Sequence, residues 1–242
     1  MMCRPRFNAC NIVCRCHDKE LSFQQLQLET ERYAKAFVGI GVKKGDIVPI
    51  CTEPSIEAVI AFFALNRLGA VSTFLNSTAG MDEVANYVNL YGSKLLLVSA
   101  QCAQRLDKEA LQQHCCVQKM YILSSESTQI SCAFPLFSEA LASYADIPAE
   151  LDVCGKDAPA HISYTSGTTG LPKAILLSNE NIMAEMISLL KVTKMQLGPK
   201  GNLLQVVPFN YPYGFIISVL LPVVAGKTAA LSPKLTLKNI GE

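Results

Sequence analysis

Residues 164–173 read YTSGTTGLPK, between the apolar segment HISYT (161–165) and the apolar segment KAILLS (173–178). The stretch contains five hydroxyl side chains, two glycines, a proline and a lysine. Short apolar segments bounded by Gly and Pro predict two strands, and the polar stretch predicts the loop that joins them.

Outward from this loop, apolar segments of strand length alternate with segments of helical period on both sides. This alternation is typical of an α/β domain with a mainly parallel sheet and flanking helices, which is the fold class we predict. A first hairpin is expected at 8–23. Further strands are expected at 47–51, 95–99, 117–123, 203–208 and 228–232.

The first helix carries the clearest local signals. Ser22 followed by Gln25 predicts a capping box at its start, and Gly41 is placed to end it. Between them, apolar residues recur at helical spacing and predict one buried face: Phe23, Leu26, Tyr33, Phe37 and Ile40. Other helices are expected from Pro54 to Gly69 and at 81–91, 103–113, 179–192 and 215–225.

The composition excludes some function classes. The chain has 242 residues, 50% of them hydrophobic, so a large core is available. Lys plus Arg number 21 against 20 for Asp plus Glu, and this balance gives no electrostatic case for nucleic acid or an anionic membrane. The uncharged run at 201–226 contains three prolines, which favours a strand and a buried helix over a membrane span. We expect a cytoplasmic protein, because the first residues contain no apolar stretch of signal-peptide length.

Four cysteines and a histidine crowd the first residues: Cys3, Cys10, Cys14, Cys16 and His17. Their spacing is not one of the usual zinc patterns. Cys10, Cys14 and Cys16 instead alternate like one face of a strand, and a free cysteine behaves as a small hydrophobe. We therefore predict no metal site.

The residue types of the loop favour binding of an anion. Gly167 and Gly170 allow a ligand oxygen to approach backbone N–H groups, and Lys173 brings a full positive charge. Hydroxyl donors come from Thr165, Ser166, Thr168 and Thr169. The loop is not the GxxxxGK[ST] phosphate loop, because Pro172 stands at the second glycine position and Ala174 follows the lysine. The alternative is an ordinary hairpin loop rich in Ser, Thr and Gly.

A longer match decides between these alternatives. YTSGTTGLPKAILLS resembles the phosphate-binding signature of the adenylate-forming (AMP-binding) enzymes, which include acyl-CoA synthetases, aryl-CoA ligases, beetle luciferases and peptide-synthetase adenylation domains. Further stretches resemble the family in the expected order, so that the resemblance spans nearly the whole chain: ELSFQQL (20–26), GVKKGDIVPICTEPSIEAVIAFFALNRLGAV (41–71), LLQVVPFNYPYGF (203–215) and LLPVVAGKTAAL (220–231).

The resemblance implies a chemistry. In such enzymes a carboxylate attacks the α-phosphate of Mg-ATP, giving an acyl-adenylate and pyrophosphate, and a thiol, commonly coenzyme A, then takes the acyl group. By this resemblance the β- and γ-phosphates are contacted by Thr165, Ser166, Gly167, Thr168, Thr169, Gly170 and Lys173. It implies no nucleophile or other catalytic residue in the loop.

A second family motif falls on PFNYPYG (208–214). Tyr211 stands where histidine is frequent, so the role of that histidine does not carry over. The resemblance implies that Tyr211 and Gly214 lie at the substrate pocket; the alternative is an aromatic residue packed beneath a loop. His161 is expected to be a structural histidine.

The family's adenine-binding loop, its magnesium-binding glutamate, its ribose-binding aspartate and its small lysine-bearing C-terminal domain have no counterpart in residues 1–242. The chain therefore resembles the first half of the large N-terminal domain, which suggests a fragment, a truncated gene product or a diverged short form. We expect the apolar strands near Leu203 and Ala229 to lack sheet partners.

Two functions stay open on this sequence. One is a ligase of the acyl-CoA synthetase type, as in fatty acid metabolism, acting on a fatty, aromatic or amino acid. The other is a non-catalytic remnant that binds phosphate, nucleotide or a protein partner.

Overall fold

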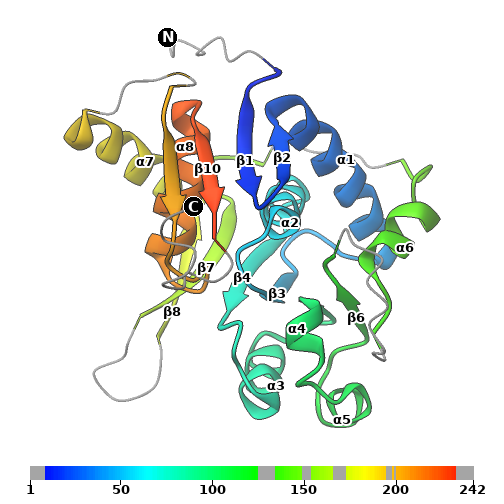
Figure 1. The fold of residues 1–242 in the computed structure, drawn as a ribbon. Coiled ribbons are helices and arrows are strands. Elements are labelled where there is room, and N and C mark those ends of the chain that lie inside the picture. The colour runs from blue at the N-terminus through cyan, green and yellow to red at the C-terminus, as the bar shows by residue number, and fades with distance from the viewer. Residues whose placement is uncertain are drawn as a thin grey trace.

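The structure is a computed structural model that describes residues 9–124, 134–148, 154–165, 173–194, 198 and 200–232. Its described strands form two sheets (Figure 1). The larger has the order β6-β5-β3-β4-β7-β8 and the smaller the order β2-β1-β10-β9. The larger sheet consists of β3 (Ile47–Cys51), β4 (Val71–Leu75), β5 (Leu95–Val98), β6 (Lys119–Ile122), β7 (Pro159–Thr165) and β8 (Lys173–Ser178). The smaller consists of β1 (Ile12–Cys16), β2 (Lys19–Ser22), β9 (Asn202–Gln205) and β10 (Thr228–Leu231).

The predicted α/β class with mainly parallel strands is confirmed, but the strands are divided between two sheets. In each sheet one pair is antiparallel, β7 with β8 and β1 with β2, and the other pairs are parallel. The sequence prediction missed β4, because Ser72 and Thr73 interrupt its apolar run. Both are fully buried, and each hydrogen bonds to a residue of β7.

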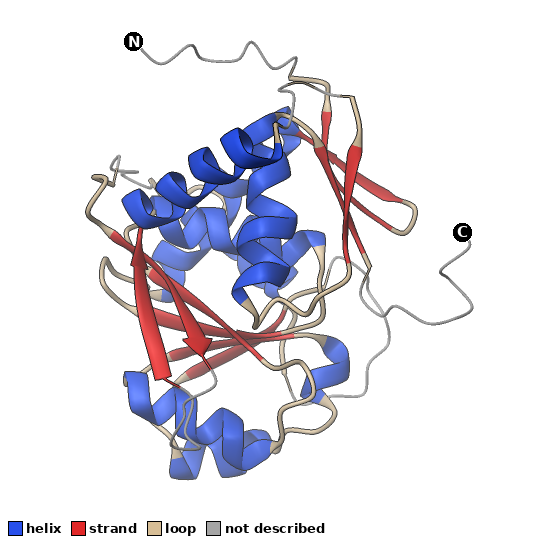
Figure 2. Ribbon diagram, turned by 90° about the vertical axis from the view of Figure 1, so that its left-hand side faces the viewer, coloured by secondary structure: helices blue, strands red, loops and turns tan. Residues whose placement is uncertain are grey.

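Helices lie between the two sheets and on the far face of the larger one (Figure 2). Between the sheets run α1 (Phe23–Ile40) and α2 (Ile56–Arg67), and α2 contacts a strand of each sheet, β1 and β4. The far face packs against α3 (Met81–Tyr91), α4 (Ala100–Ala103) and α5 (Lys108–His114). Helix α6 (Phe137–Ser143) contacts α1.

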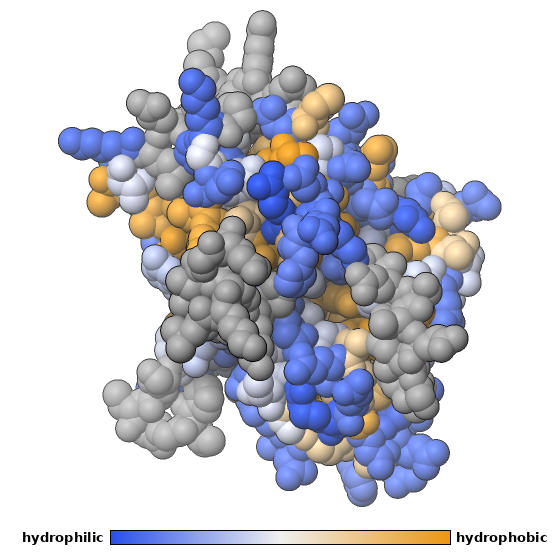
Figure 3. All heavy atoms as spheres, in the orientation of Figure 1, coloured by the Kyte–Doolittle hydropathy of each residue, from blue (hydrophilic) through white to orange (hydrophobic). Residues whose placement is uncertain are grey.

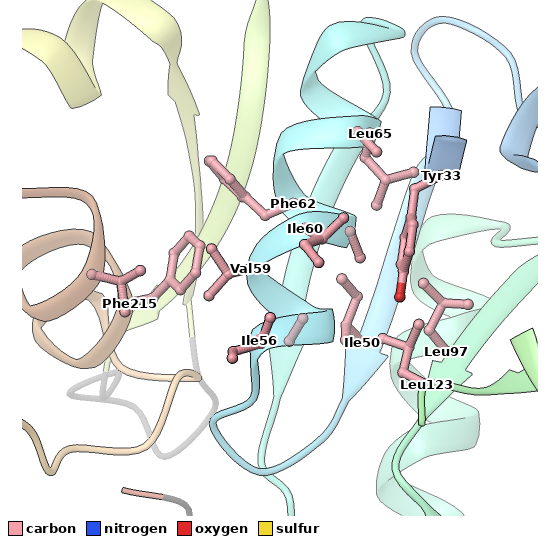
Figure 4. Packing of buried hydrophobic residues seen from close by; sticks show 14 of the residues in the cluster. Tyr33, Ile50, Ile56, Val59, Ile60, Phe62, Leu65, Leu97, Leu123 and Phe215 are labelled. Carbon is pink, nitrogen blue, oxygen red and sulfur yellow. The ribbon is translucent and has the colours of Figure 1, made fainter. Parts of the chain in front are cut away.

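The layers create two hydrophobic cores, and β5 contributes to both. Leu95 and Leu97 face the core that contains α1 and α2, whereas Leu96 and Val98 face the core that contains α3. A strand buried on both faces needs an unbroken apolar run, which is why LLLV was readable from sequence. Figure 4 shows the side chains of α2 packed between Phe215 on one side and Tyr33 on the other.

The predictions for the first helix are confirmed. Ser22 Oγ accepts from the Gln25 N–H (3.2 Å), and Gln25 Oε1 accepts from the Ser22 N–H (2.8 Å). Gly41 ends α1 with φ of 102°, in the left-handed region that favours glycine. The predicted face is buried at Leu26, Tyr33, Phe37 and Ile40, and Phe23 packs against the same core.

Three predicted helices need correction. The segment at 103–113 is not one helix, because Ser99 caps α4 and Asp107 caps α5 through their side-chain oxygens. Helix α2 begins at Ile56 with Ser55 as its cap, two residues after Pro54. The helix expected at 215–225 begins as a π-helix, η1 (Tyr213–Leu220), and continues as α8 (Leu221–Ala225). Pro222 has no N–H for the carbonyl four residues earlier, which disfavours a continuous α-helix there.

The strand near Ala229 does not lack partners, so that prediction is wrong. β10 pairs with β1 on one side and β9 on the other, and Ala229 is fully buried. β9, near Leu203, is at the edge of the described sheet, where Leu204 is 59% and Val206 42% exposed. Figure 3 shows hydrophobic side chains at the surface where Figure 1 draws α7 (Asn179–Thr193) and β9.

Cys14 and Cys16 are buried on β1 on either side of the exposed Arg15, as their alternation predicts. Burial raises the pKa of the Cys14 thiol, and burial raises the pKa of Cys16 to about 11, so both stay neutral near pH 7. Cys10 precedes the strand, and Cys3 lies outside the described residues. Among the described helices, none combines the length and the apolar character needed to cross a membrane.

Candidate functional site

The loop is carried by the antiparallel hairpin of β7 and β8. Across this pair Thr165 lies directly opposite Lys173 in the strand register. Both residues are exposed at the end of the hairpin. The seven residues 166–172 connect them in the sequence. Ser166, Gly167, Thr168, Thr169 and Gly170 lie outside the described residues, so their predicted phosphate contacts stay predictions.

A pocket of about 260 Å³ opens beside the end of the hairpin. β4 and β7 are parallel neighbours, and the pocket lies past their carboxyl ends, where open α/β sheets bind their ligands. Its lining comes from several separate segments and consists of Phe74, Leu75, Asn76, Glu83, Tyr87, Tyr164, Thr165, Asn210 and Tyr211. The structure thus brings Tyr211, from the second motif, to the same pocket as Thr165.

One wall of the pocket is a cluster of tyrosines that the sequence analysis missed. Tyr164 Oη lies 2.7 Å from Tyr91 Oη and 3.1 Å from Thr73 Oγ1. The rings of Tyr87 and Tyr164 lie 4.8 Å apart between centroids. Burial raises the pKa of Tyr164, so its hydroxyl stays neutral. This wall therefore offers hydroxyl groups and aromatic faces without charge.

The turn before η1 holds Tyr211 in place. The Tyr211 N–H donates to the Pro208 carbonyl (3.1 Å), and the Gly214 N–H donates to the Tyr211 carbonyl (2.9 Å). Tyr211 is 55% exposed. Gly214 is buried and does not line the pocket; it packs against the carbonyl oxygens of Val207 and Pro208.

Asn210 is a second residue that the sequence analysis did not single out. Its Oδ1 atom is buried, and within the described part of the chain it meets no hydrogen-bond donor. Because an unsatisfied buried acceptor costs about 1–3 kcal/mol, this atom is suited to accept a hydrogen bond from a ligand in the pocket. No local sequence signal marks it, since an asparagine in a turn usually bonds to its own backbone.

An apolar groove of about 500 Å³ lies on the other side of the hairpin end. β8, α7 and η1 form it, with Ile175, Leu176, Ile182, Ile216 and Ile217 among its lining. Thr165 lines both the pocket and the groove. A larger hollow, about 610 Å³, lies between α1, α2 and α7 and shares no lining residue with the pocket.

His161 lies in the core and is confirmed as a structural histidine. It is 2% exposed, and its Nδ1 atom lies 2.9 Å from Ser72 Oγ. Its ring packs among Phe62, Phe74 and Phe215. Burial lowers the pKa of His161 to about 4, so it is a neutral ring that does not reach the pocket.

Because His161 is buried and neutral, we expect the free energy of unfolding to fall in acid. The folded state takes up the proton only near pH 4, whereas the unfolded chain takes it up near pH 6.5. The stabilisation is therefore present above pH 6.5 and is lost as the pH falls toward 4. We expect the free energy of unfolding in urea to drop by about 2 kcal/mol from pH 7 to pH 5 because of His161 alone. His161→Gln should remove this part of the pH dependence and His114→Gln should not; equal pH profiles for wild type and His161→Gln would contradict the assignment.

Comparisons with known proteins show the family of the chain and its fold. A family model described as AMP-binding enzyme matches residues 5–240. The chain is 27% identical over 220 residues to 4-coumarate–CoA ligase 3 of Arabidopsis thaliana. This match covers 89% of the chain and 38% of the ligase. Among solved structures, ATP-bound MatB from Rhodopseudomonas palustris has a TM-score of 0.80 at 21% identity, covering 96% of this chain and 44% of that one.

The anthranilate CoA ligase AuaEII in complex with anthranoyl-AMP has a TM-score of 0.82 at 19% identity, covering 96% of this chain and 43% of that one. At these identities the two structural likenesses show the fold. The chain spans less than half the length of each of these relatives.

Proposed function

The chain belongs to the AMP-binding enzyme family, and from this membership we propose that it provides the phosphate-binding part of an enzyme that activates a carboxylic acid with ATP. In that reaction a carboxylate oxygen bonds to the α-phosphorus, the bond to the β-phosphate breaks, and an acyl-adenylate and pyrophosphate result. We propose coenzyme A as the thiol that then takes the acyl group, because the Arabidopsis relative is named a CoA ligase.

The observation that carries this proposal is the pairing of Thr165 with Lys173 at the end of the hairpin. Side chains directly opposite each other in an antiparallel pair lie on the same face of the sheet, about 5 Å apart at their Cβ atoms. A hydroxyl donor and an ammonium group therefore converge where the loop begins and ends. The glycines and hydroxyls at 166–170 would complete this cluster of donors around a phosphate chain.

In the proposed reaction these groups act on the leaving group. Lys173 and Thr165 would hold the β- and γ-phosphates and stabilise the negative charge that develops on the departing pyrophosphate. The described residues contain no cluster of three metal-binding side chains. Magnesium would therefore arrive with the nucleotide, whose phosphate oxygens are its usual ligands.

The acid would bind next to Thr165. Tyr211 and Asn210 line the pocket, and the Tyr211 hydroxyl and the Asn210 side-chain NH₂ group are donors of the kind that a carboxylate accepts. The adjacent groove is lined mainly by apolar side chains, which supports an acid with an apolar body, such as a fatty or an aromatic acid. Gly214 would serve this site indirectly, by allowing the turn that carries Tyr211.

The buried thiols of Cys14 and Cys51 form no disulfide, in keeping with a cytoplasmic location.

A second candidate is a non-catalytic protein that binds a nucleotide or a protein partner. The edge position of β9 among the described strands favours it, because Leu204 and Val206 are exposed near this edge and an unpaired edge can accept another strand. Both candidates share the phosphate site and differ in turnover.

The proposed function can be tested with a series of ligands on the 242-residue chain. Because the hairpin is proposed to hold the β- and γ-phosphates, Mg-ATP and magnesium pyrophosphate should raise the melting temperature, whereas AMP should have little effect. At ten times the dissociation constant the expected stabilisation is about 1.4 kcal/mol, or roughly 3–6 °C. A shift with AMP equal to that with ATP, or no shift with either ATP or pyrophosphate, would contradict the phosphate site.

Turnover is measured separately, as exchange of labelled pyrophosphate into ATP with a panel of fatty, aromatic and amino acids. We expect the chain by itself to stay near background, since the hairpin provides only the leaving-group contacts and alignment of the reactants can account for about 7–11 kcal/mol of a barrier. Exchange near one turnover per second would show that these residues form a complete site.

A further inference from the structure

Two cysteines from separate segments meet behind the pocket wall. Cys51 is the last residue of β3, and Cys102 lies in α4. The Ser99 N–H donates to the Cys51 carbonyl (2.9 Å), which brings the start of α4 to the end of β3. The two thiols lie close enough to interact, and their residues are only 0% and 1% exposed.

The same two thiols support the segment that follows β4. Cys51 Sγ donates to the Asn76 carbonyl (3.3 Å), and Cys102 Sγ donates to the Ser77 carbonyl (3.0 Å). These are consecutive carbonyls, and Asn76 lines the pocket beside the hairpin. The thiol pair is therefore linked to one wall of the candidate site by two hydrogen bonds.

Two charged groups flank Cys102, and the hydrogen bond from Cys51 is the main reason why it is the more reactive thiol of the pair. Glu53 Oε1 lies 3.8 Å from Cys102 Sγ, where it can accept the thiol proton. Arg105 Nη2 lies 3.4 Å from the same sulfur and stabilises the thiolate. When Cys102 is ionised, the Cys51 thiol can donate its proton to it in place of the Asn76 carbonyl, and this bond lowers the pKa of Cys102. The same bond and burial raise the pKa of Cys51, and the charge of Glu53 opposes the Cys102 thiolate. Arg105, which contacts the sulfur, is itself exposed to solvent.

We propose that Cys51 and Cys102 are a site of reversible oxidation, at which hydrogen peroxide or another small hydroperoxide converts the two thiols into a disulfide. The Cys102 thiolate attacks the terminal peroxide oxygen and the O–O bond breaks. The hydroxide that leaves hydrogen peroxide, or the alkoxide that leaves an organic hydroperoxide, takes a proton to become water or an alcohol. Cys51 sulfur then attacks the sulfenic sulfur of Cys102, the S–O bond breaks, and water leaves with the Cys51 proton. Two electrons pass from the thiols to the peroxide.

Oxidation would change the pocket wall, because the disulfide has no hydrogen to donate to Asn76 or Ser77. The Ser77 carbonyl keeps the Arg105 guanidinium as a donor and the Asn76 carbonyl keeps the Ala79 N–H, so each loses only its thiol donor. An effect of oxidation on ligand binding rests on the proposed function. The disulfide itself does not, and it is tested without any ligand.

The test is peptide mapping of the native chain after treatment with hydrogen peroxide and alkylation of the remaining thiols. Trypsin places Cys51 in the peptide 45–67 and Cys102 in the peptide 95–105, each as the only cysteine. We expect these peptides to be joined, with a mass about 2 Da below their sum, and to separate on reduction with dithiothreitol. Absence of the joined peptide in a sample where the exposed Cys116 is oxidised would overturn the proposal.

Variants test the order of the steps. In Cys51→Ser, dimedone should label Cys102 as a trapped sulfenic acid, and in Cys102→Ser it should leave Cys51 unlabelled; the reverse pattern would overturn the assigned roles. Arg105→Gln, in which the second peptide runs 95–108, should form the disulfide more slowly than the wild type, because the Cys102 thiolate loses the guanidinium beside it. Cys116→Ser is the matched control and should oxidise at the pair like the wild type. Serine can donate to the same carbonyls, so the variants should fold, and the wild-type map decides the proposal even if one does not.

Discussion

Replacing Lys173 with alanine is expected to weaken the binding of Mg-ATP and of magnesium pyrophosphate by about 10- to 100-fold. The reason is the loss of a charge-assisted contact with the phosphates, which contributes about 1.5–3 kcal/mol. Binding of AMP should change little, because AMP lacks the β- and γ-phosphates. The melting temperature without ligand should stay within about 1–2 °C of the wild type, since Lys173 is exposed at the end of β8 and surface substitutions usually change stability by less than 0.5 kcal/mol.

Isothermal titration with the three ligands measures this effect, and thermal unfolding monitors the fold. Lys191→Ala is the matched control, because Lys191 is an exposed lysine on α7 away from the hairpin end. Lys173→Arg keeps the charge and should retain part of the affinity. If Lys173→Ala binds ATP and pyrophosphate as tightly as the wild type while remaining folded, the hairpin end is not the phosphate site.

Replacing Gly214 with alanine is expected to destabilise the chain by about 3 kcal/mol or more, which corresponds to roughly 6–12 °C in melting temperature. An added Cβ atom would lie closer to the Val207 and Pro208 carbonyl oxygens than the sum of the van der Waals radii allows, and 2.8 Å from the Pro208 carbonyl carbon. These are backbone atoms, so no side-chain rotation relieves the clash. The turn that presents Asn210 and Tyr211 would have to shift.

Urea and thermal unfolding measure this loss, and Gly155→Ala provides the comparison. Apart from its chain neighbours, no atom of the described residues lies within 4 Å of a Cβ added at Gly155, and the φ of Gly155 is not positive. We expect Gly155→Ala to be neutral or slightly stabilising, since alanine lowers the conformational entropy of the unfolded chain. Equal stability of Gly214→Ala and Gly155→Ala would mean that the turn before η1 does not pack closely against residues 207 and 208.

Helices and strands whose limits depend on residues close in sequence could be predicted accurately from the sequence. Ser22 and Gln25 cap α1 and Gly41 ends it, because capping needs only groups three or four residues apart. The limits of β3 and α3 follow from unbroken local patterns. The predictions failed at Ser72 and Thr73, whose partners are about ninety residues away, and at 103–113, where two separate capping residues divided one apparent helix.

The candidate site shows the same division. The sequence by itself identified the hairpin, its loop and Tyr211, because a family signature is a run of adjacent residues. Only the tertiary structure placed Tyr211 and Asn210 beside Thr165, joined Tyr91 to Tyr164, and brought Cys51 to Cys102. The physical reason is that these pairs are separated by about 45 to 75 residues. Their contact depends on how parallel strands stack side by side and on which helix covers which face, and neither is encoded in any one stretch of the chain.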